Sequence, residues 1–214
     1  MEAPFWHERW AKHEIGFHMP TPHAALERYW RSLQLAAGSR VFVPLAGKSL
    51  DLVWLARAGY QVVGIELSPV AVAEFRAEHP SEIAIDLRCG DFFDLTPDTL
   101  GPVDAIFDRA SLVALPPAMR SDYVAHITAL SKPATQTLLV TMEYDQSQMR
   151  GPPHAVLESE VQALYGARHD IETLERIEVL ADYPRMIERG VRFVQVWSGP
   201  QGASNNWDNH GSIV

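Results

Sequence analysis

A glycine and a glutamate in the first half of the chain have the spacing expected of a nucleoside site. Gly47 follows the short apolar run 41–45, where a glycine can take a positive φ and let a ligand approach the backbone. Glu66 comes 19 residues later, at the end of the apolar run 61–66, and a carboxylate so placed can accept both hydroxyls of an adenosine ribose. The alternative is a plain turn and a solvated strand-end glutamate, but the combined spacing favours the ribose site.

The Gly-Lys-Ser triplet at 47–49 is not a phosphate-binding loop. That motif requires a glycine five residues before its second glycine, and Phe42 stands there. A dinucleotide G-x-G-x-x-G also fails, because Leu45 and Ser49 are not glycines. A nucleotide-dependent oxidoreductase is therefore a weaker alternative, since only Glu66 and the α/β pattern fit it.

Two more groups of polar residues follow apolar runs. In residues 89–93, Asp91 and the neighbouring backbone can hydrogen-bond an adenine edge while Phe92 or Phe93 stacks nearby; the alternative is that both rings are core and that Cys89 is a small buried hydrophobe. Arg109 follows the run 103–108, and its permanent charge could hold an anionic substrate or lower the pKa of a thiol. A structural ion pair between Arg109 and Asp108 is an equal alternative.

The N-terminal segment is rich in aromatic and histidine side chains. Trp6, Trp10 or Phe17 could supply an aromatic face to a nucleoside with a positively charged sulfur, although such rings are more often ordinary packing. The nine histidines show neither H-E-x-x-H nor another regular ligand spacing. We therefore expect no metal site.

The elements that would position these residues alternate along the chain. Apolar runs predict strands, and helical periodicity with Gly59, Ser68-Pro69 and Gly166 as boundary signals predicts helices. The expected strands are 41–45, 61–66, 84–89, 103–108, 137–142, 171–177 and 191–197, and the expected helices are 50–56, 68–78, 117–130 and 158–165. This order predicts an α/β sheet covered on both faces, with ligands at the carboxyl ends of its strands. Residues 5–35 would form a lid or extra helix.

Composition limits the class of protein. The chain has 214 residues, 47% of them hydrophobic and 21% charged, which is typical of a globular protein. Its net charge of −9 argues against a broad nucleic-acid footprint and anionic membranes. One cysteine excludes an intrachain disulfide, and neither a secretory signal nor a membrane span is visible. We expect a cytoplasmic protein acting on a small molecule, and a monomer, because no apolar heptad is visible.

We expect a single domain over residues 1–198, in which residues 1–35 are the N-terminal cap. Residues 199–214 have a different composition and contain all three asparagines of the chain. They predict a disordered tail, with Trp207 solvated or docked on the body.

An ordered set of motifs resembles the bacterial branch of the thiopurine S-methyltransferase family. The resemblance covers roughly residues 5–165 and is more specific than any single motif. The matching segments are FWHERW at 5–10, IGFH at 15–18, VPLAGKSLDL at 43–52, VGIELS at 63–68, CGDFF at 89–93, DRASL at 108–112, YDQSQM at 144–149 and GPP at 151–153.

The resemblance implies a Rossmann-like class I methyltransferase fold, with a doubly wound, mostly parallel sheet of seven strands. It also implies S-adenosyl-L-methionine as cofactor, with S-adenosyl-L-homocysteine as product. Trp10 would pack on the cofactor, Leu45 and Gly47 would line its methionine and ribose side, and Glu66 would bind the ribose. The remaining residues implied at the cofactor are Leu67, Cys89, Gly90, Asp91, Phe92 and Arg109. The acceptor pocket would include Trp6, Phe17, His18 and Tyr144.

Three departures from the family pattern concern mainly the acceptor side. Ala46 stands where the family usually has cysteine, residues 75–89 form a shorter segment than usual, and the region after Gly166 matches poorly. These departures affect the expected acceptor more than the expected methyl transfer.

The expected reaction is in-line transfer of a methyl group to the sulfur of a small aromatic or heterocyclic thiol such as a thiopurine, a detoxification chemistry. The thiolate is the reactive form, so Arg109 would favour the incoming anion and His18 could deprotonate a weaker acid. Two alternatives remain on the same scaffold. One is methyl transfer to selenium or tellurium oxyanions, thiocyanate or halide, and the other is a non-catalytic binder of an adenosyl ligand.

Overall fold

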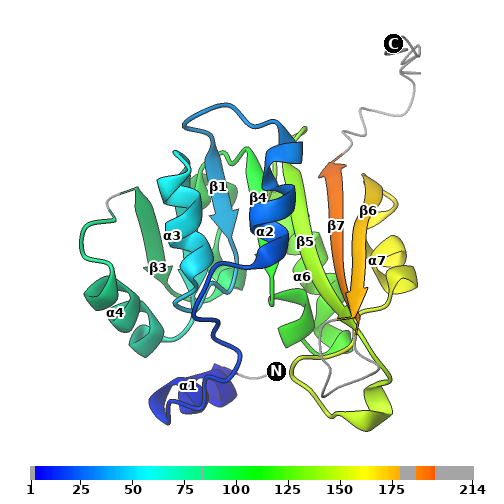
Figure 1. The fold of residues 1–214 in the computed structure, drawn as a ribbon, viewed down its shortest axis with the longest axis horizontal. Helices are drawn as coiled ribbons and strands as arrows, with labels where there is room; N and C mark the ends of the chain where they lie inside the picture. The colour runs from blue at the N-terminus through cyan, green and yellow to red at the C-terminus, as the bar shows by residue number, and fades with distance from the viewer. Residues whose placement is uncertain (1–2, 83, 179–186, 196–214) are drawn as a thin grey trace.

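A mixed sheet with helices on both faces organises the chain (Figure 1). The computed structural model describes residues 3–82, 84–178 and 187–195. The strands are β1 Arg40–Val43, β2 Gln61–Glu66, β3 Ile85–Cys89, β4 Ala105–Arg109, β5 Gln136–Glu143, β6 His169–Glu178 and β7 Ile187–Gln195. Their order across the sheet is β3-β2-β1-β4-β5-β7-β6.

The sheet is mostly parallel. The five neighbours from β3 to β5 all pair in parallel, and β7 and β6 extend the sheet to seven strands. Strand β7 is antiparallel to both of its neighbours. The expected doubly wound α/β architecture is therefore confirmed.

Most strand boundaries lie within one or two residues of those expected, and the largest difference is at the start of β7. Strand β1 ends at Val43, because Leu45 takes a φ of 44° and the chain turns there. Strand β7 begins at Ile187, four residues before the expected 191, and ends at Gln195. The last two residues of the expected strand, 196–197, lie outside the described residues, as do the expected tail and Trp207.

The helices begin at recognisable signals. Ser49 and Ser68 are N-caps whose hydroxyls accept hydrogen bonds from Asp51 N and Ala71 N, and Pro69 takes the first helical position after Ser68. The α-helices are α1 Ala3–Ala11, α2 Ala24–Tyr29, α3 Leu50–Arg57, α4 Pro69–Glu78, α5 Pro97–Leu100, α6 Pro117–Leu130 and α7 Glu158–Tyr165.

Two hydrophobic cores lie on opposite faces of the sheet. Because side chains alternate along a strand, Phe42 joins one core while Val41 and Val43 join the other. In the same way, Ile106 joins the first core and Phe107 joins the second. The first core contains residues of α5, α6 and α7, and the second contains residues of α2, α3 and α4. Burial on both faces explains why these strands are continuous apolar runs.

The N-terminal segment divides into two parts. Helix α1 lies near the carboxyl end of β1, at the edge of the sheet where a ligand is expected (Figure 1). Helix α2 and the 3-10 turn Trp30–Leu33 instead belong to the second core, where Leu26, Trp30 and Leu33 are almost fully buried. Among the described residues, no helix has the length and apolarity needed to cross a membrane.

Candidate active site

The candidate site lies where the strand order reverses. The chain runs outward from β1 to β2 and β3, then returns to place β4 on the other side of β1. Such a reversal opens a crevice outside the carboxyl ends of the two central strands. The turn after β1 and the residues at the ends of β2 and β4 therefore meet at one edge.

The β1–α3 turn is shaped by Gly47. This residue has a φ of 54°, and an added Cβ would lie 3.1 Å from the indole of Trp10. Glycine is thus required both by the backbone conformation and by the close approach of α1. The ring of Trp10, which is only 2% exposed, covers the turn from the N-terminal side.

Glu66 is a buried carboxylate that holds this turn. Its Oε2 accepts a hydrogen bond from Gly47 N at 2.8 Å, and its Oε1 accepts one from Ser68 N at 2.7 Å. Burial raises the pKa of Glu66, while the two backbone amides act in the opposite direction. The two residues paired by spacing are therefore in direct contact, and Glu66 is not a solvated strand-end residue. Each carboxylate oxygen has a further lone pair with which it could accept a ligand hydroxyl.

The residues after β3 serve different purposes. Gly90 N donates to Glu66 O at 2.9 Å, which keeps this turn beside the end of β2. Leu67 is partly buried in the same region, and its carbonyl oxygen accepts a hydrogen bond from the Cys89 thiol at 3.9 Å. Asp91 is exposed, and its Oδ1 accepts from Phe93 N at 2.9 Å.

The ring of Phe92 packs in the first core, against Phe42 and Tyr123, and is 2% exposed. Phe92 is therefore too buried to stack on a ligand at the edge of the sheet. Phe93 is 37% exposed and could do so. Cys89 is exposed rather than buried, so its interpretation as a core residue is wrong.

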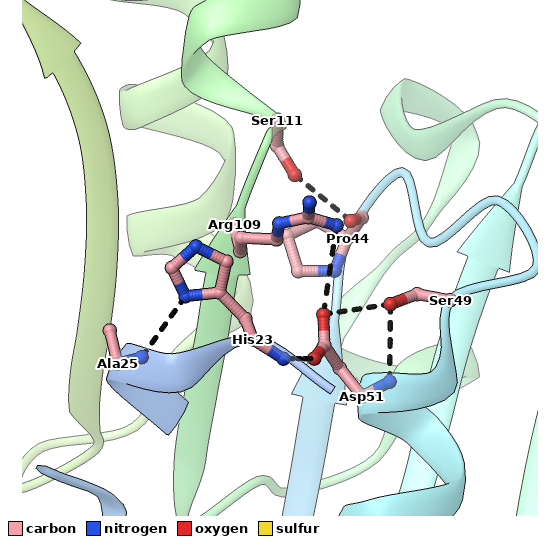
Figure 2. Close-up of polar contacts among 7 residues, drawn as sticks. All are labelled: His23, Ala25, Pro44, Ser49, Asp51, Arg109 and Ser111. Atoms are coloured by element: carbon pink, nitrogen blue, oxygen red, sulfur yellow. Dashed lines mark hydrogen bonds and ion pairs between the residues drawn. The ribbon is translucent and has the colours of Figure 1, made fainter. Parts of the chain in front are cut away.

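Arg109 pairs with a residue that the sequence analysis did not single out. Its Nη1 lies 3.8 Å from Oδ2 of Asp51 on α3, as Figure 2 shows. The alternative partner, Asp108, points to the opposite face of β4, where its Oδ2 accepts from the Tyr123 hydroxyl at 2.8 Å. Successive side chains of a strand alternate between faces, so an ion pair between Asp108 and Arg109 is excluded. The only sequence signal for Asp51 is its position two residues after the Ser49 cap.

Aromatic rings and a histidine border the site on its N-terminal side. Phe17 is 40% exposed and makes edge contacts to both Trp6 and Trp10, each with a centroid distance of 5.6 Å. His18 is partly buried. Burial, together with the positive charges of Lys48 and Arg109, lowers the pKa of His18. This imidazole is consequently neutral near pH 7 and can accept a proton.

The side chain of Lys48, in the Gly-Lys-Ser triplet, forms ion pairs with two glutamates of the protein. Its Nζ lies 2.9 Å from Glu74 Oε2 and 2.7 Å from Glu78 Oε1, both on α4. Burial opposes the charge of Lys48, but the hydrogen bonds with Glu78 and Glu74 prevail and its pKa is raised. The lysine therefore joins the β1–α3 turn to α4, in agreement with the absence of a phosphate-loop motif.

Tyr144 anchors the loop that follows β5. Its buried hydroxyl donates to Pro153 O and accepts from Gln146 Nε2 at 3.0 Å, and burial raises its pKa. The same loop is attached to the 3-10 turn Leu112–Ala114, which follows β4, because His154 N donates to Val113 O at 2.6 Å. Tyr144 thus holds the Gly-Pro-Pro segment, and its expected contact with an acceptor stays a prediction.

The edge as a whole combines a buried carboxylate, a glycine turn, aromatic rings and one guanidinium. Hydroxyl groups of a ligand could be accepted by Glu66, and an anion could be received by Arg109. Within the part of the chain that the structure describes, no three or more His, Cys, Asp or Glu side chains are grouped in a way that could hold a metal ion.

Comparison with known proteins gives a consistent result. The sequence model of the thiopurine S-methyltransferase family matches residues 1–197. A thiopurine S-methyltransferase of Nitrosospira multiformis is 47% identical over 91% of this chain and 95% of its own. One from Pseudomonas fluorescens is 44% identical over 89% and 94%.

A solved structure of the Burkholderia thailandensis 1,6-didemethyltoxoflavin-N1-methyltransferase, with S-adenosylhomocysteine bound, is similar in fold. It has a TM-score of 0.65 and 17% sequence identity, and the match covers 91% of this chain and 87% of that one.

Proposed function

The chain belongs to the thiopurine S-methyltransferase family and is an S-adenosylmethionine-dependent methyltransferase, and we propose that its acceptor is the sulfur of a small aromatic or heterocyclic thiol, such as a thiopurine. The observation that carries this proposal is the position of Arg109. Arg109 ends β4, the strand next to β1, and its Nη1 lies 3.8 Å from Asp51 Oδ2 at the start of α3. An anionic acceptor bound to this guanidinium would approach a nucleoside held by Gly47 and Glu66.

The residues present fit the cofactor. Glu66 is buried and retains lone pairs for two ribose hydroxyls, and the positive φ of Gly47 forms the turn whose amide binds that carboxylate. Phe17, which is 40% exposed, offers an aromatic face to a cation, while the buried Trp10 packs behind it against the Gly47 turn. The exposed Asp91 can accept from an adenine amino group. When bound, S-adenosylmethionine supplies a methyl group on a positively charged sulfur, which becomes a neutral thioether once the methyl group has left.

Arg109 favours the ionised acceptor. Its guanidinium carries a positive charge at every working pH, and its side chain is only 16% exposed, so solvent screens this charge less than it would a surface charge. A fixed cation at this position lowers the free energy of a thiolate that approaches the methyl group. Because aromatic heterocyclic thiols are already largely ionised near neutral pH, Arg109 needs only to bind and orient the anion.

His18 extends the reaction to less acidic thiols. Its lowered pKa keeps the imidazole neutral near pH 7, so its free nitrogen lone pair can accept the proton of an un-ionised thiol. Trp6 and Phe17 would border the acceptor on the same side. We assign His18 the role of base only for acceptors whose thiol is protonated at the working pH.

The proposal is tested by calorimetric titration with S-adenosylhomocysteine followed by an acceptor screen. We expect micromolar binding to the wild type and a loss of at least about tenfold in Glu66→Ala and Glu66→Gln. Glu27→Ala, at an exposed position of α2, is the matched control and keeps full affinity. Thermal unfolding of each variant checks that the loss does not come from misfolding.

The acceptor screen compares an aromatic thiol with selenite, thiocyanate and iodide at equal concentrations, using labelled methyl donor. Turnover of the thiol supports the proposed acceptor, and exclusive turnover of the small anions contradicts it. Absence of binding at millimolar S-adenosylhomocysteine would contradict the cofactor site itself.

A further inference from the structure

We propose that Asp51 is a positioning residue that orients the Arg109 guanidinium and links it to the N-terminal segment bordering the acceptor. The inference rests on the proposed function, because it assigns to Asp51 a part in presenting Arg109 to the acceptor. Asp51 lies in the first turn of α3, two residues after the Ser49 cap, and is not part of the contact between Gly47 and Glu66.

Both carboxylate oxygens of Asp51 are in use (Figure 2). Oδ1 accepts from the backbone N–H of His23 at 2.7 Å, and Oδ2 accepts from the Ser49 hydroxyl at 2.7 Å. Oδ2 also lies 3.8 Å from Arg109 Nη1. One side chain thereby joins three segments far apart in the sequence, namely the start of α2, the β1–α3 turn and the end of β4.

The two hydrogen-bond donors to Asp51, a backbone N–H and a hydroxyl, do not explain why this side chain is negatively charged. Asp51 is only 2% exposed, and a buried carboxylate costs free energy unless a cation or several donors compensate for it. An uncharged amide could accept from His23 N and contact the Ser49 hydroxyl equally well. The group that distinguishes a carboxylate from an amide is Arg109, which is the cation paired with Asp51 in Figure 2.

The distance between Asp51 and Arg109 allows Asp51 to orient the guanidinium without occupying its N–H groups. A separation of 3.8 Å is longer than a direct hydrogen bond, so the N–H groups of Arg109 stay available to an acceptor. A flexible arginine would lose side-chain entropy each time it met the anion. Holding it beside Asp51 beforehand removes that cost from the reaction, as a preorganised cation does.

The contact with His23 extends this effect to the N-terminal segment. His23 precedes α2, and its Nδ1 accepts from Ala25 N at 3.2 Å, so the helix start is fixed where Asp51 holds it. The chain before His23 contains Phe17 and His18, the residues proposed to border the acceptor. Asp51 therefore fixes the guanidinium and this segment relative to one another.

The competing explanation is a purely structural role, in which Asp51 only stabilises the start of α3. Asp104 provides a matched control for that possibility. It also accepts from a backbone N–H, that of Arg40 at 2.8 Å, and pairs with a cation, Lys132 at 2.6 Å. Its contacts lie at the start of β1, the opposite end of the strand from the site.

The test measures kcat and KM for an aromatic thiol in Asp51→Asn, Arg109→Ala, the double variant and Asp104→Asn. We expect Asp51→Asn to lower kcat about tenfold with S-adenosylhomocysteine affinity changed by less than about threefold. In the Asp51→Asn background, Arg109→Ala should cost much less than in the wild type, because residues acting as a unit are not additive. Asp104→Asn should lower the unfolding temperature and leave kcat unchanged.

A second measurement does not depend on turnover. The ¹⁵N order parameter of the Arg109 Nε–H group, assigned by its absence in Arg109→Ala, should fall in Asp51→Asn and stay at the wild-type value in Asp104→Asn. Fully multiplicative losses in the double variant, or an unchanged order parameter, would overturn the inference. If the wild type methylates no thiol, the proposed function fails, and the order parameter still decides whether Asp51 orients Arg109.

Discussion

Gly47 is favoured for two steric reasons, its backbone conformation and its contact with Trp10. Its φ of 54° lies in the left-handed region, and the position of an added Cβ is 3.1 Å from Trp10. The backbone conformation alone costs other residues about 1–2 kcal/mol. The approach of Trp10 adds a packing cost that only a shift of α1 or of the turn could relieve.

We expect Gly47→Ala to lower stability by about 1–3 kcal/mol and to weaken S-adenosylhomocysteine binding about tenfold. Denaturant unfolding and calorimetry measure the two effects. Gly16→Ala is the control, because an added Cβ there meets nothing within 4 Å. Unchanged affinity in Gly47→Ala would show that the turn does not contact the cofactor.

The residues of the site were predictable from the sequence to different degrees. Gly47 and Glu66 have a fixed spacing that follows from one strand–helix–strand unit, and the structure brings them into contact. The alternative that pairs Arg109 with Asp108 is wrong, because successive side chains of a strand point to opposite faces of the sheet. Asp51 was missed because its contact with Arg109 spans 58 residues, from 51 to 109, and no local pattern encodes such a contact.

Lys48 shows how an element boundary can imitate a functional motif. Its side chain is 11% exposed and bridges Glu74 and Glu78 of α4. The lysine thereby fixes the beginning of α3 against α4, and the adjacent glycine and serine serve the turn and the helix cap. The resemblance of residues 47–49 to a phosphate loop is a consequence of these separate structural needs.

Lys48→Met keeps the apolar stem of the side chain and removes its charge. We expect a loss of about 1–3 kcal/mol of stability, because Glu74 and Glu78 both lose the ammonium group that they share. S-adenosylhomocysteine affinity should fall by less than about threefold, since we assign Lys48 no ligand contact. A complete loss of cofactor binding at unchanged stability would instead indicate a lysine that contacts the ligand.

The regular elements were more predictable than the segments between them. Strands buried on both faces appear as continuous apolar runs, which is why β2 has the expected bounds and β4 lies within two residues of them. The short helix Pro97–Leu100 and the loop anchored by Tyr144 were not predicted. Their conformations depend on capping between Thr96 and Thr99 and on contacts across the chain, neither of which has a hydrophobic period.

The sheet separates two cores, and β4 shows what each face contributes to the protein. Asp108 points into the first core and Arg109 toward α3. One residue is thus buried beside Tyr123, while its neighbour is free to face the site. The proposed function depends on Arg109, whereas the burial of Asp108 affects the stability of the folded chain.

Asp108 makes that stability depend on pH. It is completely buried, and burial raises its pKa from the ordinary 3.8 to about 6, against the opposing hydrogen bond from Tyr123. The folded state therefore holds this proton more tightly than the unfolded chain does. The resulting stabilisation is fully present below pH 3.8 and is lost as the pH rises through 6.

From the shift, this loss is about 3 kcal/mol. We expect the stability of the wild type relative to Asp108→Asn to fall by that amount between pH 3.5 and pH 7.5, as measured by urea unfolding at each pH. Taking the difference between the two proteins cancels every other titrating group and any constant effect of the amide. A constant difference for Asp108→Asn would mean that its carboxyl titrates alike in the folded and unfolded chains, and that the first core tolerates the charge.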